Sequence, residues 1–369
     1  MQLHRSSGRS GRGVLDAASH HCSGTERFSK QKDFPKSADL RPSHVLTRPG
    51  SRGRRGSTNE FGSLMKMRIA SLAFTLSVLA SSALAADISP LVDAEWVKAN
   101  AGDKDVVILD IRDKVAETEL GDKPYIQGAV VAPYASAGWR TEVGGVPGML
   151  PPLEQITKLI GDLGIDNDDH VVIVPWGTDS TEFGGATRVY WTFKYLGHEE
   201  VSILDGGWRQ YDAAGGTRSA EAVKPEPATF HAEPQEKLLA TTEEVAAALK
   251  AGVKLIDGRP AEQHQGKSKS PVVRANGTIP GSINIEHSKL YSQDHALFAR
   301  PETVKALTEA AGLAAEEEII TFCNTGHWAS VTWFALSEVL GNKNTTMYDG
   351  SMAEWTADPA RPVENKSGT

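Results

Sequence analysis

The stretch Ile319-Ile320-Thr321-Phe322-Cys323-Asn324-Thr325-Gly326-His327-Trp328-Ala329-Ser330 decides the fold. Three of its first four residues are β-branched, which predicts a buried strand that ends at a cysteine. An apolar pattern with helical spacing follows, and Ser330 is placed to cap a helix there. Backbone N–H groups of such a loop and the helix dipole both favour negative charge. Since the thiolate is the nucleophilic form of cysteine, the stretch predicts thiolate chemistry at Cys323.

Length and composition describe a globular protein of about two domains. The chain has 369 residues, of which 40% are hydrophobic and 23% are charged, so a sizeable core can form. Charge is divided unevenly, with a net +7 over residues 1–64 and a net −17 over residues 69–369. An acidic body disfavours nucleic acid as a partner.

Residues 1–64 are rich in Arg, Ser and Gly and show no apolar periodicity. We expect a disordered segment, or an N-terminal extension that arises from a start codon assigned too early. A basic arm is an alternative. A metal site at His20-His21-Cys22 is another, but a single cluster without a second one is a weak metal signal.

Residues 65–85 have the three parts of a secretory signal peptide. Met65-Lys66-Met67-Arg68 is basic, Ile69 to Leu79 is apolar, and Ala83-Leu84-Ala85 is a small-residue cleavage site. The apolar part is too short for a comfortable membrane span. We therefore expect export to the periplasm or the medium, cleavage near Ala85, and no stable membrane anchor afterwards.

Beyond that point the chain repeats itself with a period of about 145 residues, too long for a solenoid. Val106 to Arg112 recurs as Val253 to Arg259, and Val172 to Trp176 recurs as Ile319 to Cys323, which aligns Trp176 with the cysteine. We expect one domain over residues 86–222, a Pro-rich linker over 223–236 and a second domain over 237–369.

Short apolar strands alternate with helical segments in each copy. The predicted helices are Asp93–Asn100, Leu153–Leu163, Thr241–Ala251 with a Thr241/Glu244 capping box, Pro301–Ala311 and Ser330–Leu340. Such alternation predicts an α/β fold in which each copy has a mostly parallel sheet with helices on both faces. Ligands of these sheets bind at the carboxyl ends of strands, where Cys323 is expected.

The repeated motifs resemble those of the rhodanese family, the tandem-domain sulfurtransferases. The carriers of the resemblance are Leu109-Asp110-Ile111-Arg112 and its copy Ile256-Asp257-Gly258-Arg259, Gly277 to Asn284, Cys323 to Gly326, and Tyr348 to Trp355. The resemblance implies a first domain without the thiol and a second, catalytic one. It implies a Cys323 persulfide that carries sulfur from a small anionic donor to a thiophilic acceptor such as cyanide or a thiol, with a protein as a further acceptor. It implies no cofactor and no metal.

The resemblance also implies the substrate-binding residues. The amides of Asn324, Thr325, Gly326, His327, Trp328 and Ala329 would cradle the anion, and Arg259 would contact the donor. A structural salt bridge between Arg259 and Asp257 is the alternative.

The loop after Cys323 departs from the family pattern, because it has no Lys or Arg and has Trp328 at the usual closing position. His327 could supply part-time positive charge, or it could face solvent. The missing closing Arg disfavours a related phosphatase activity. The expected donor is thiosulfate, with 3-mercaptopyruvate second. A non-enzymatic persulfide or anion relay for a partner protein is the alternative function, and a redox sensor lacks a resolving cysteine.

Overall fold

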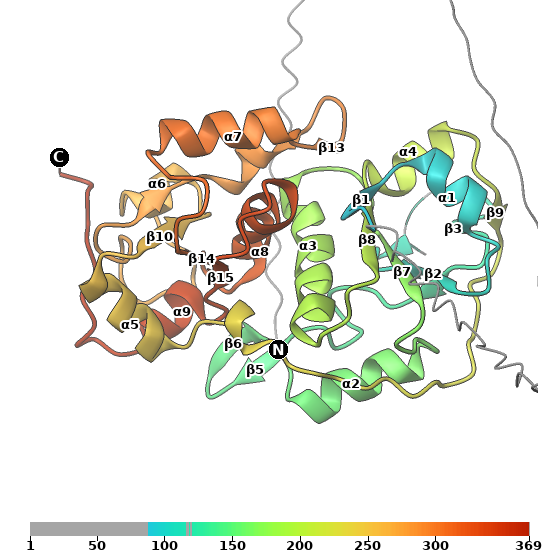
Figure 1. The fold of residues 1–369 in the computed structure, drawn as a ribbon, viewed down its shortest axis with the longest axis horizontal. Coiled ribbons are helices and arrows are strands. Elements are labelled where there is room, and N and C mark those ends of the chain that lie inside the picture. The colour runs from blue at the N-terminus through green and yellow to red at the C-terminus, as the bar shows by residue number, and fades with distance from the viewer. Residues whose placement is uncertain (1–87, 116–117, 119, 369) are drawn as a thin grey trace, which may run out of the picture. The chain divides into compact units, whose positions relative to one another are not determined.

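The computed structural model describes residues 88–115, 118 and 120–368, so the expected extension and signal peptide lie outside the described residues. The described chain holds two parallel sheets (Figure 1). The first sheet has the order β1 (Leu91–Val92), β8 (Val201–Leu204), β7 (His170–Val174), β2 (Val106–Asp110) and β4 (Val130–Val131). The second has the order β11 (Ile283–Asn284), β10 (Lys254–Asp257), β14 (Ile319–Phe322) and β15 (Thr345–Met347).

Helices cover both faces of each sheet, as predicted. The first sheet is covered by α1 (Ala94–Asn100), α2 (Leu153–Asp162), α3 (Ser180–Tyr195) and α4 (Gly207–Ala213). The second half contains α5 (Thr242–Ala251), α6 (Ala261–His264), α7 (Pro301–Ala310), α8 (His327–Phe334) with a π-helical continuation η4 (Ala335–Val339), and α9 (Ser351–Trp355). Successive side chains of β7 point to opposite faces of the sheet, so both faces are apolar and can bind helices. Val172 packs towards α1 and α4, while Ile173 packs towards α2 and α3.

Within the described residues, three two-stranded antiparallel pairs and the 3₁₀ turns η2 (Glu236–Leu238) and η3 (His287–Leu290) lie beside the sheets. The pairs are β3 (Tyr125–Ile126) with β9 (Arg218–Ser219), β5 (Thr141–Val143) with β6 (Val146–Met149), and β12 (Tyr291–Ser292) with β13 (Leu297–Phe298). The predicted capping box at Thr241 and Glu244 and the first-turn Pro301 are confirmed.

The two halves share one core, in which α3 of the first half lies beside α8 of the second (Figure 1). Tyr190 on α3 meets the ring of Phe334 edge-on, with ring centroids 5.0 Å apart. Beneath the rings the hydroxyls of Thr187 and Ser330 lie 2.8 Å apart. This contact brings first-half residues to the loop that carries Cys323.

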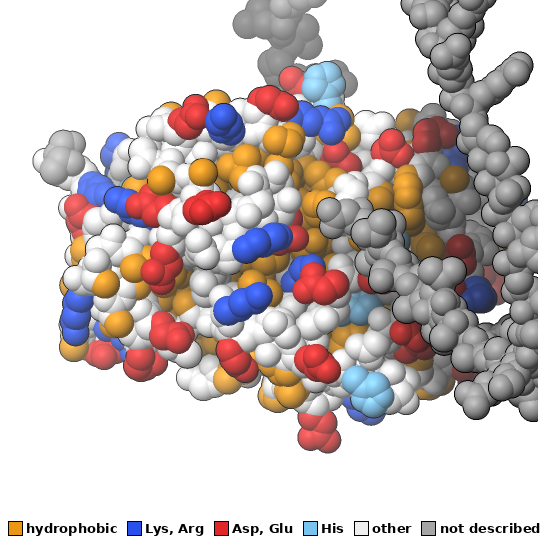
Figure 2. All heavy atoms as spheres, viewed as in Figure 1, with side chains coloured by type: hydrophobic (Ala, Val, Ile, Leu, Met, Phe, Trp, Pro, Cys, Tyr) orange, Lys and Arg blue, Asp and Glu red, His pale blue; other side chains and the backbone are white. Residues whose placement is uncertain are grey.

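Residues 223–236 connect the two halves and run along the outside of the first half (Figure 1). The amides of Ala228, Glu233 and Gln235 donate to carbonyl oxygens of Gly161, Leu196 and Tyr195, respectively. On the face seen in Figure 2, acidic and basic side chains are interspersed. Among the described residues, no helix has both the length and the apolar character needed to cross a membrane.

Candidate active site

Cys323 follows β14 directly and is 1% exposed. Among the described residues it is the one cysteine, and its thiol is free. The predicted strand, loop and helix are confirmed, but α8 begins at His327 and the prediction that Ser330 caps it is wrong. The left-handed Gly326 starts the helix one turn earlier, so Ser330 lies within it and donates to the carbonyl oxygen of His327.

Gly326 is required at this position for two reasons. Its φ of 73° is left-handed, which side chains other than glycine rarely adopt. A Cβ there would also collide with the guanidinium of Arg188 and the carboxylate of Asp349. These two groups form a buried ion pair of 2.5 Å between the halves, directly beneath the loop.

Ser351 closes the loop from the other side. Its hydroxyl oxygen accepts the N–H groups of Cys323 at 3.0 Å and Gly326 at 3.1 Å, and it donates to the carbonyl oxygen of Tyr348 at 2.9 Å. Ser351 has a left-handed φ of 51°, a strained geometry that these three hydrogen bonds hold in place. The sequence placed Ser351 in a repeated motif but gave no sign of this role.

Two amide groups of the loop have no acceptor within the described part of the chain, namely the N–H groups of Asn324 and Thr325. The carbonyl oxygens of Cys323 and Asn324 accept from the first turn of α9, at Met352 and Ala353. In a trans peptide the N–H points opposite to the preceding carbonyl. The two free N–H groups therefore point away from α9.

The cations near the thiol come from the first half. Arg140 donates to the carbonyl oxygens of Gly148 at 2.8 Å and Thr325 at 2.6 Å. Arg188 is fully buried, and its Nε and Nη2 have no hydrogen-bond partner among the residues that the structure describes. Burial would lower the pKa of Arg188, but the Asp349 carboxylate outweighs it and raises that pKa, so the guanidinium stays charged.

His327 is half-buried, and both of its ring nitrogens lie within hydrogen-bond distance of residues of the first half. Burial, and then the charge of Arg140, lower the pKa of His327 to about 3. Its Nε2 lies 2.8 Å from the carbonyl oxygen of Thr181, which can only accept, so Nε2 carries the hydrogen. Its Nδ1 then accepts from the Tyr134 hydroxyl at 2.9 Å.

Trp328 and Ala329 continue the first turn of α8. The Trp328 ring stacks on His287 at 4.5 Å with an interplanar angle of 6°, and its Nε1 donates to the hydroxyl of Thr181 at 3.2 Å. Burial lowers the pKa of His287 to about 4, so this stack is uncharged near neutral pH. Ala329 is fully buried.

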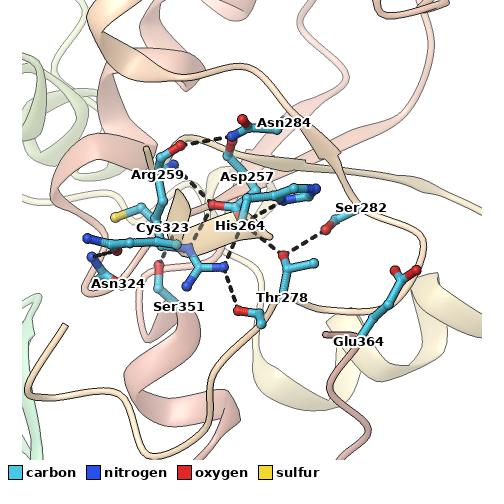
Figure 3. Close-up of polar contacts among 12 residues, drawn as sticks. Asp257, Arg259, His264, Thr278, Ser282, Asn284, Cys323, Asn324, Ser351 and Glu364 are labelled. Atoms are coloured by element: carbon cyan, nitrogen blue, oxygen red, sulfur yellow. Dashed lines mark hydrogen bonds and ion pairs between the residues drawn. The ribbon is translucent and has the colours of Figure 1, made fainter. Parts of the chain in front are cut away.

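Arg259 does not line the pocket and instead forms the salt bridge with Asp257 that the sequence left open as the alternative. Its guanidinium donates to both carboxylate oxygens of Asp257, at 2.9 and 2.6 Å, and to the carbonyl oxygen of Gly277 (Figure 3). Burial acts to raise the pKa of Asp257, but hydrogen bonding from His264 and the charge of Arg259 lower it to about 2. The first half repeats this pair as Arg112 with Asp110, so the motif is structural in both copies.

A pocket of about 440 Å³ opens beside the thiol, and both halves line it. Its lining consists of Tyr134, Arg140, Pro147, Gly148, Ser270, Val272, Cys323, Asn324, Thr325, His327 and Trp328. Of the predicted site residues it includes Cys323, Asn324, Thr325, His327 and Trp328, while Arg259, Gly326 and Ala329 are absent from the lining. Within the described residues no group of His, Cys, Asp or Glu side chains could hold a metal ion.

The first half places Pro175, and not Trp176, at the position of the cysteine. Asp110 pairs with Val174 in the first sheet as Asp257 pairs with Phe322 in the second. The next residues are therefore Pro175 and Cys323. Trp176 therefore corresponds to Asn324, and the loop of the first half has one residue more before its helix.

Comparison with known proteins identifies relatives over most of the described chain. The model of the rhodanese-like domain matches residues 93–214 and again residues 241–358. A Mycolicibacterium smegmatis protein, provisionally named a thiosulfate sulfurtransferase, is 33% identical over 283 residues, which cover 74% of this chain and 97% of that protein. A similarly named Haloferax volcanii protein is 29% identical over 74% of this chain and 96% of its own length.

Solved structures share the fold at lower identity. The 3-mercaptopyruvate sulfurtransferase SseA from Escherichia coli has a TM-score of 0.61 and 24% identity, covering 71% of this chain and 98% of its own. An anaerobic ergothioneine biosynthesis enzyme from Chlorobium limicola has a TM-score of 0.64 and 21% identity, covering 74% of this chain and 70% of its own.

Proposed function

This chain belongs to the rhodanese-like family, and from that premise we propose that it moves sulfane sulfur from an anionic donor through a persulfide on Cys323 to a thiophilic acceptor. The relatives named as sulfurtransferases make it an enzyme of that class. One observation carries the proposal of a persulfide. The free thiol of Cys323 lines a pocket beside Arg140.

The proposed reaction is a double displacement. The Cys323 thiolate attacks the outer sulfur of thiosulfate, the S–S bond of the donor breaks, and sulfite leaves with the bonding electron pair. The acceptor, for example cyanide, then attacks the outer sulfur of the persulfide, thiocyanate leaves, and the thiolate is restored. Neither half needs an oxidant, a reductant or a metal.

The environment of Cys323 supports anionic intermediates at each stage. The unpaired N–H groups of Asn324 and Thr325 are preorganised donors for a negatively charged sulfur or oxygen. The buried guanidinium of Arg188 lies below the loop, with two N–H positions unpartnered. We propose that Arg140, rather than Arg259, contacts the donor, because its half-buried guanidinium borders the pocket.

Replacement of the thiol tests the proposal. After incubation with thiosulfate, the wild-type protein should gain the mass of one sulfur atom on the peptide that contains Cys323, and it should form thiocyanate from cyanide. Cys323→Ser should do neither. If the Ser variant kept thiocyanate formation, the nucleophile would lie elsewhere.

The same assay with other donors addresses specificity. We propose thiosulfate as the first donor and 3-mercaptopyruvate as the second, following the names of the relatives and of SseA. A small acceptor suits a thiol that is 1% exposed and reached through a pocket. The alternative of a relay module predicts loading by one sulfur that only a partner protein removes, so rapid turnover with cyanide or a small thiol would exclude it.

We also propose that the protein is exported and that its signal peptide is cleaved near Ala85. The support is the order of basic, apolar and small residues in 65–85. N-terminal sequencing of protein recovered outside the cytoplasm should begin near Ala86, and a sequence that begins at Met1 would contradict this.

A further inference from the structure

The first half retains the loop that in the second half carries the thiol. In the first half the carbonyl oxygens of Pro175 and Trp176 accept from the first turn of α4, at Trp208 and Arg209. In the second half those of Cys323 and Asn324 accept in the same way from α9. The N–H groups of Trp176 and Gly177 therefore correspond to the free N–H groups of Asn324 and Thr325.

A side chain of the first half occupies its own loop. The Glu182 carboxylate accepts the N–H of Trp176 at 2.6 Å through one oxygen and the N–H of Gly177 at 3.1 Å through the other. Burial raises the pKa of Glu182 to about 7, and these hydrogen bonds oppose the rise. Glu182 is the third residue of α3, and the third residue of α8 is Ala329, which has no group to fill its loop.

The occupied loop connects to the thiol loop through the residue before Glu182. The carbonyl oxygen of Thr181 accepts from His327, and its hydroxyl accepts from Trp328. His327 and Trp328 form the first turn of α8, which follows the pocket-lining residues Asn324 and Thr325 after Gly326. The two hydrogen bonds between Glu182 and the first-half loop thus fix the turn of α3 that holds the catalytic loop.

We propose that the Glu182 carboxylate occupies the loop of the first half in the way that a bound anion would occupy the Cys323 loop. We also propose that Glu182 acts, through Thr181, as a positioning residue for the catalytic loop. This inference rests on the proposed function for its effect on sulfur transfer. The positioning itself can be measured without sulfur chemistry.

Removal of the carboxylate, followed by its replacement from solution, tests the proposal on the full chain. Glu182→Ala should speed hydrogen exchange in the peptide that covers Asn324–Ala329 and should slow persulfide formation about tenfold, because small misplacements of reacting groups are costly. Formate should slow exchange at Trp176 and Gly177 by occupying the vacated N–H groups, but it should not restore Asn324–Ala329, because it is not attached to α3. Formamide, which has the same size but no charge, should slow exchange at neither place.

Two further variants separate positioning from a general loss of stability. Thr181→Val, at an exposed position, removes the acceptor for Trp328 but leaves the first-half loop filled, so it should loosen the catalytic loop without rescue by formate. Glu302→Ala removes an exposed first-turn glutamate of α7 and should change neither readout.

Several outcomes would overturn the proposal. Exchange in Glu182→Ala could rise only around Trp176 and Gly177 and stay unchanged in Asn324–Ala329. Formate could fail to slow exchange in a Glu182→Ala protein that is folded. If Glu182→Ala did not fold, unchanged exchange in Thr181→Val would overturn it. A wild-type protein that forms no persulfide with any donor would overturn the proposed function, while the exchange results would still decide this inference.

Discussion

In the proposed function, Arg140 is the residue through which the pocket most directly distinguishes an anion from a neutral molecule. The loop itself has no cation, and His327 is neutral because burial and Arg140 lower its pKa to about 3. Arg188 forms an ion pair with Asp349 beneath the loop. Arg140 is half-buried and donates hydrogen bonds to two backbone carbonyl oxygens, and its side chain lines the pocket.

Arg140→Gln should therefore impair donor use without impairing folding. A hydrogen bond to a charged group is worth about 1.5–3 kcal/mol, so we expect kcat/KM for thiosulfate to fall by about 10- to 100-fold, mainly through a higher KM. Steady-state rates over a series of thiosulfate concentrations measure this.

Arg259→Gln is the matched comparison, because it removes a guanidinium that the pocket does not contain. It breaks a fully buried ion pair with Asp257, which should cost about 3 kcal/mol or more of stability. Urea unfolding should show that loss. A raised KM in Arg259→Gln with unchanged stability would return the donor contact to Arg259.

At the scale of elements, the catalytic loop is held by contacts on two sides. On one side, the hydroxyl oxygen of Ser351, the first residue of α9, accepts hydrogen bonds from two N–H groups of the loop. On the other side, the carbonyl oxygen of Thr181 in α3 accepts a hydrogen bond from His327 in the first turn of α8. Gly326 lies between them and allows the loop to pass over the ion pair of Arg188 and Asp349. The geometry of the loop thus depends on helices from both halves.

Gly326→Ala should be costlier than an ordinary replacement of a left-handed glycine. Gly312 is the control, because its φ of 72° is nearly the same and a Cβ there would meet no neighbouring atom. Gly312→Ala should cost about 1–2 kcal/mol from backbone strain alone. Gly326→Ala should cost about 2 kcal/mol more, since it also disturbs a buried ion pair, and should slow persulfide formation. Equal losses in urea unfolding would show that the contact with Arg188 and Asp349 is unimportant.

At the scale of the molecule, local patterns were predictable and contacts between the halves were not. The duplication, the parallel sheets and the thiol at a strand end follow from motifs that each span only a few residues. Arg140 lies 185 residues from its acceptor Thr325, and no spacing in the sequence links them. The motif of Arg259 is present in both copies, and the pairing of its guanidinium with Asp257 in the interior is visible only in the structure.

Buried histidines make the stability of the whole described chain depend on pH. Burial lowers the pKa of His198 to about 4, of His287 to about 4 and of His327 to about 3, whereas histidine in an unfolded chain has a pKa of about 6.5. Below pH 6.5 the unfolded chain therefore binds protons that the folded chain refuses. Their contribution to stability is complete above pH 6.5 and is lost as the pH falls towards 4.

Glu182 works in the opposite direction, because its folded pKa of about 7 lies above the unfolded value of 4.5 and the folded state binds the extra proton. Between pH 6 and 5, the three histidines and Glu182 together make the unfolded chain bind about two protons more than the folded chain. The free energy of unfolding should therefore change by about 2.7 kcal/mol per pH unit. Urea unfolding at intervals of half a pH unit should show the urea midpoint falling over this range.

His198→Phe, which keeps an aromatic ring beside Phe193 and Phe230, should reduce the pH dependence of the unfolding free energy by about one proton. Replacement of the exposed His231 is the control, and an equal reduction in both variants would contradict the assignment of the slope to buried imidazoles.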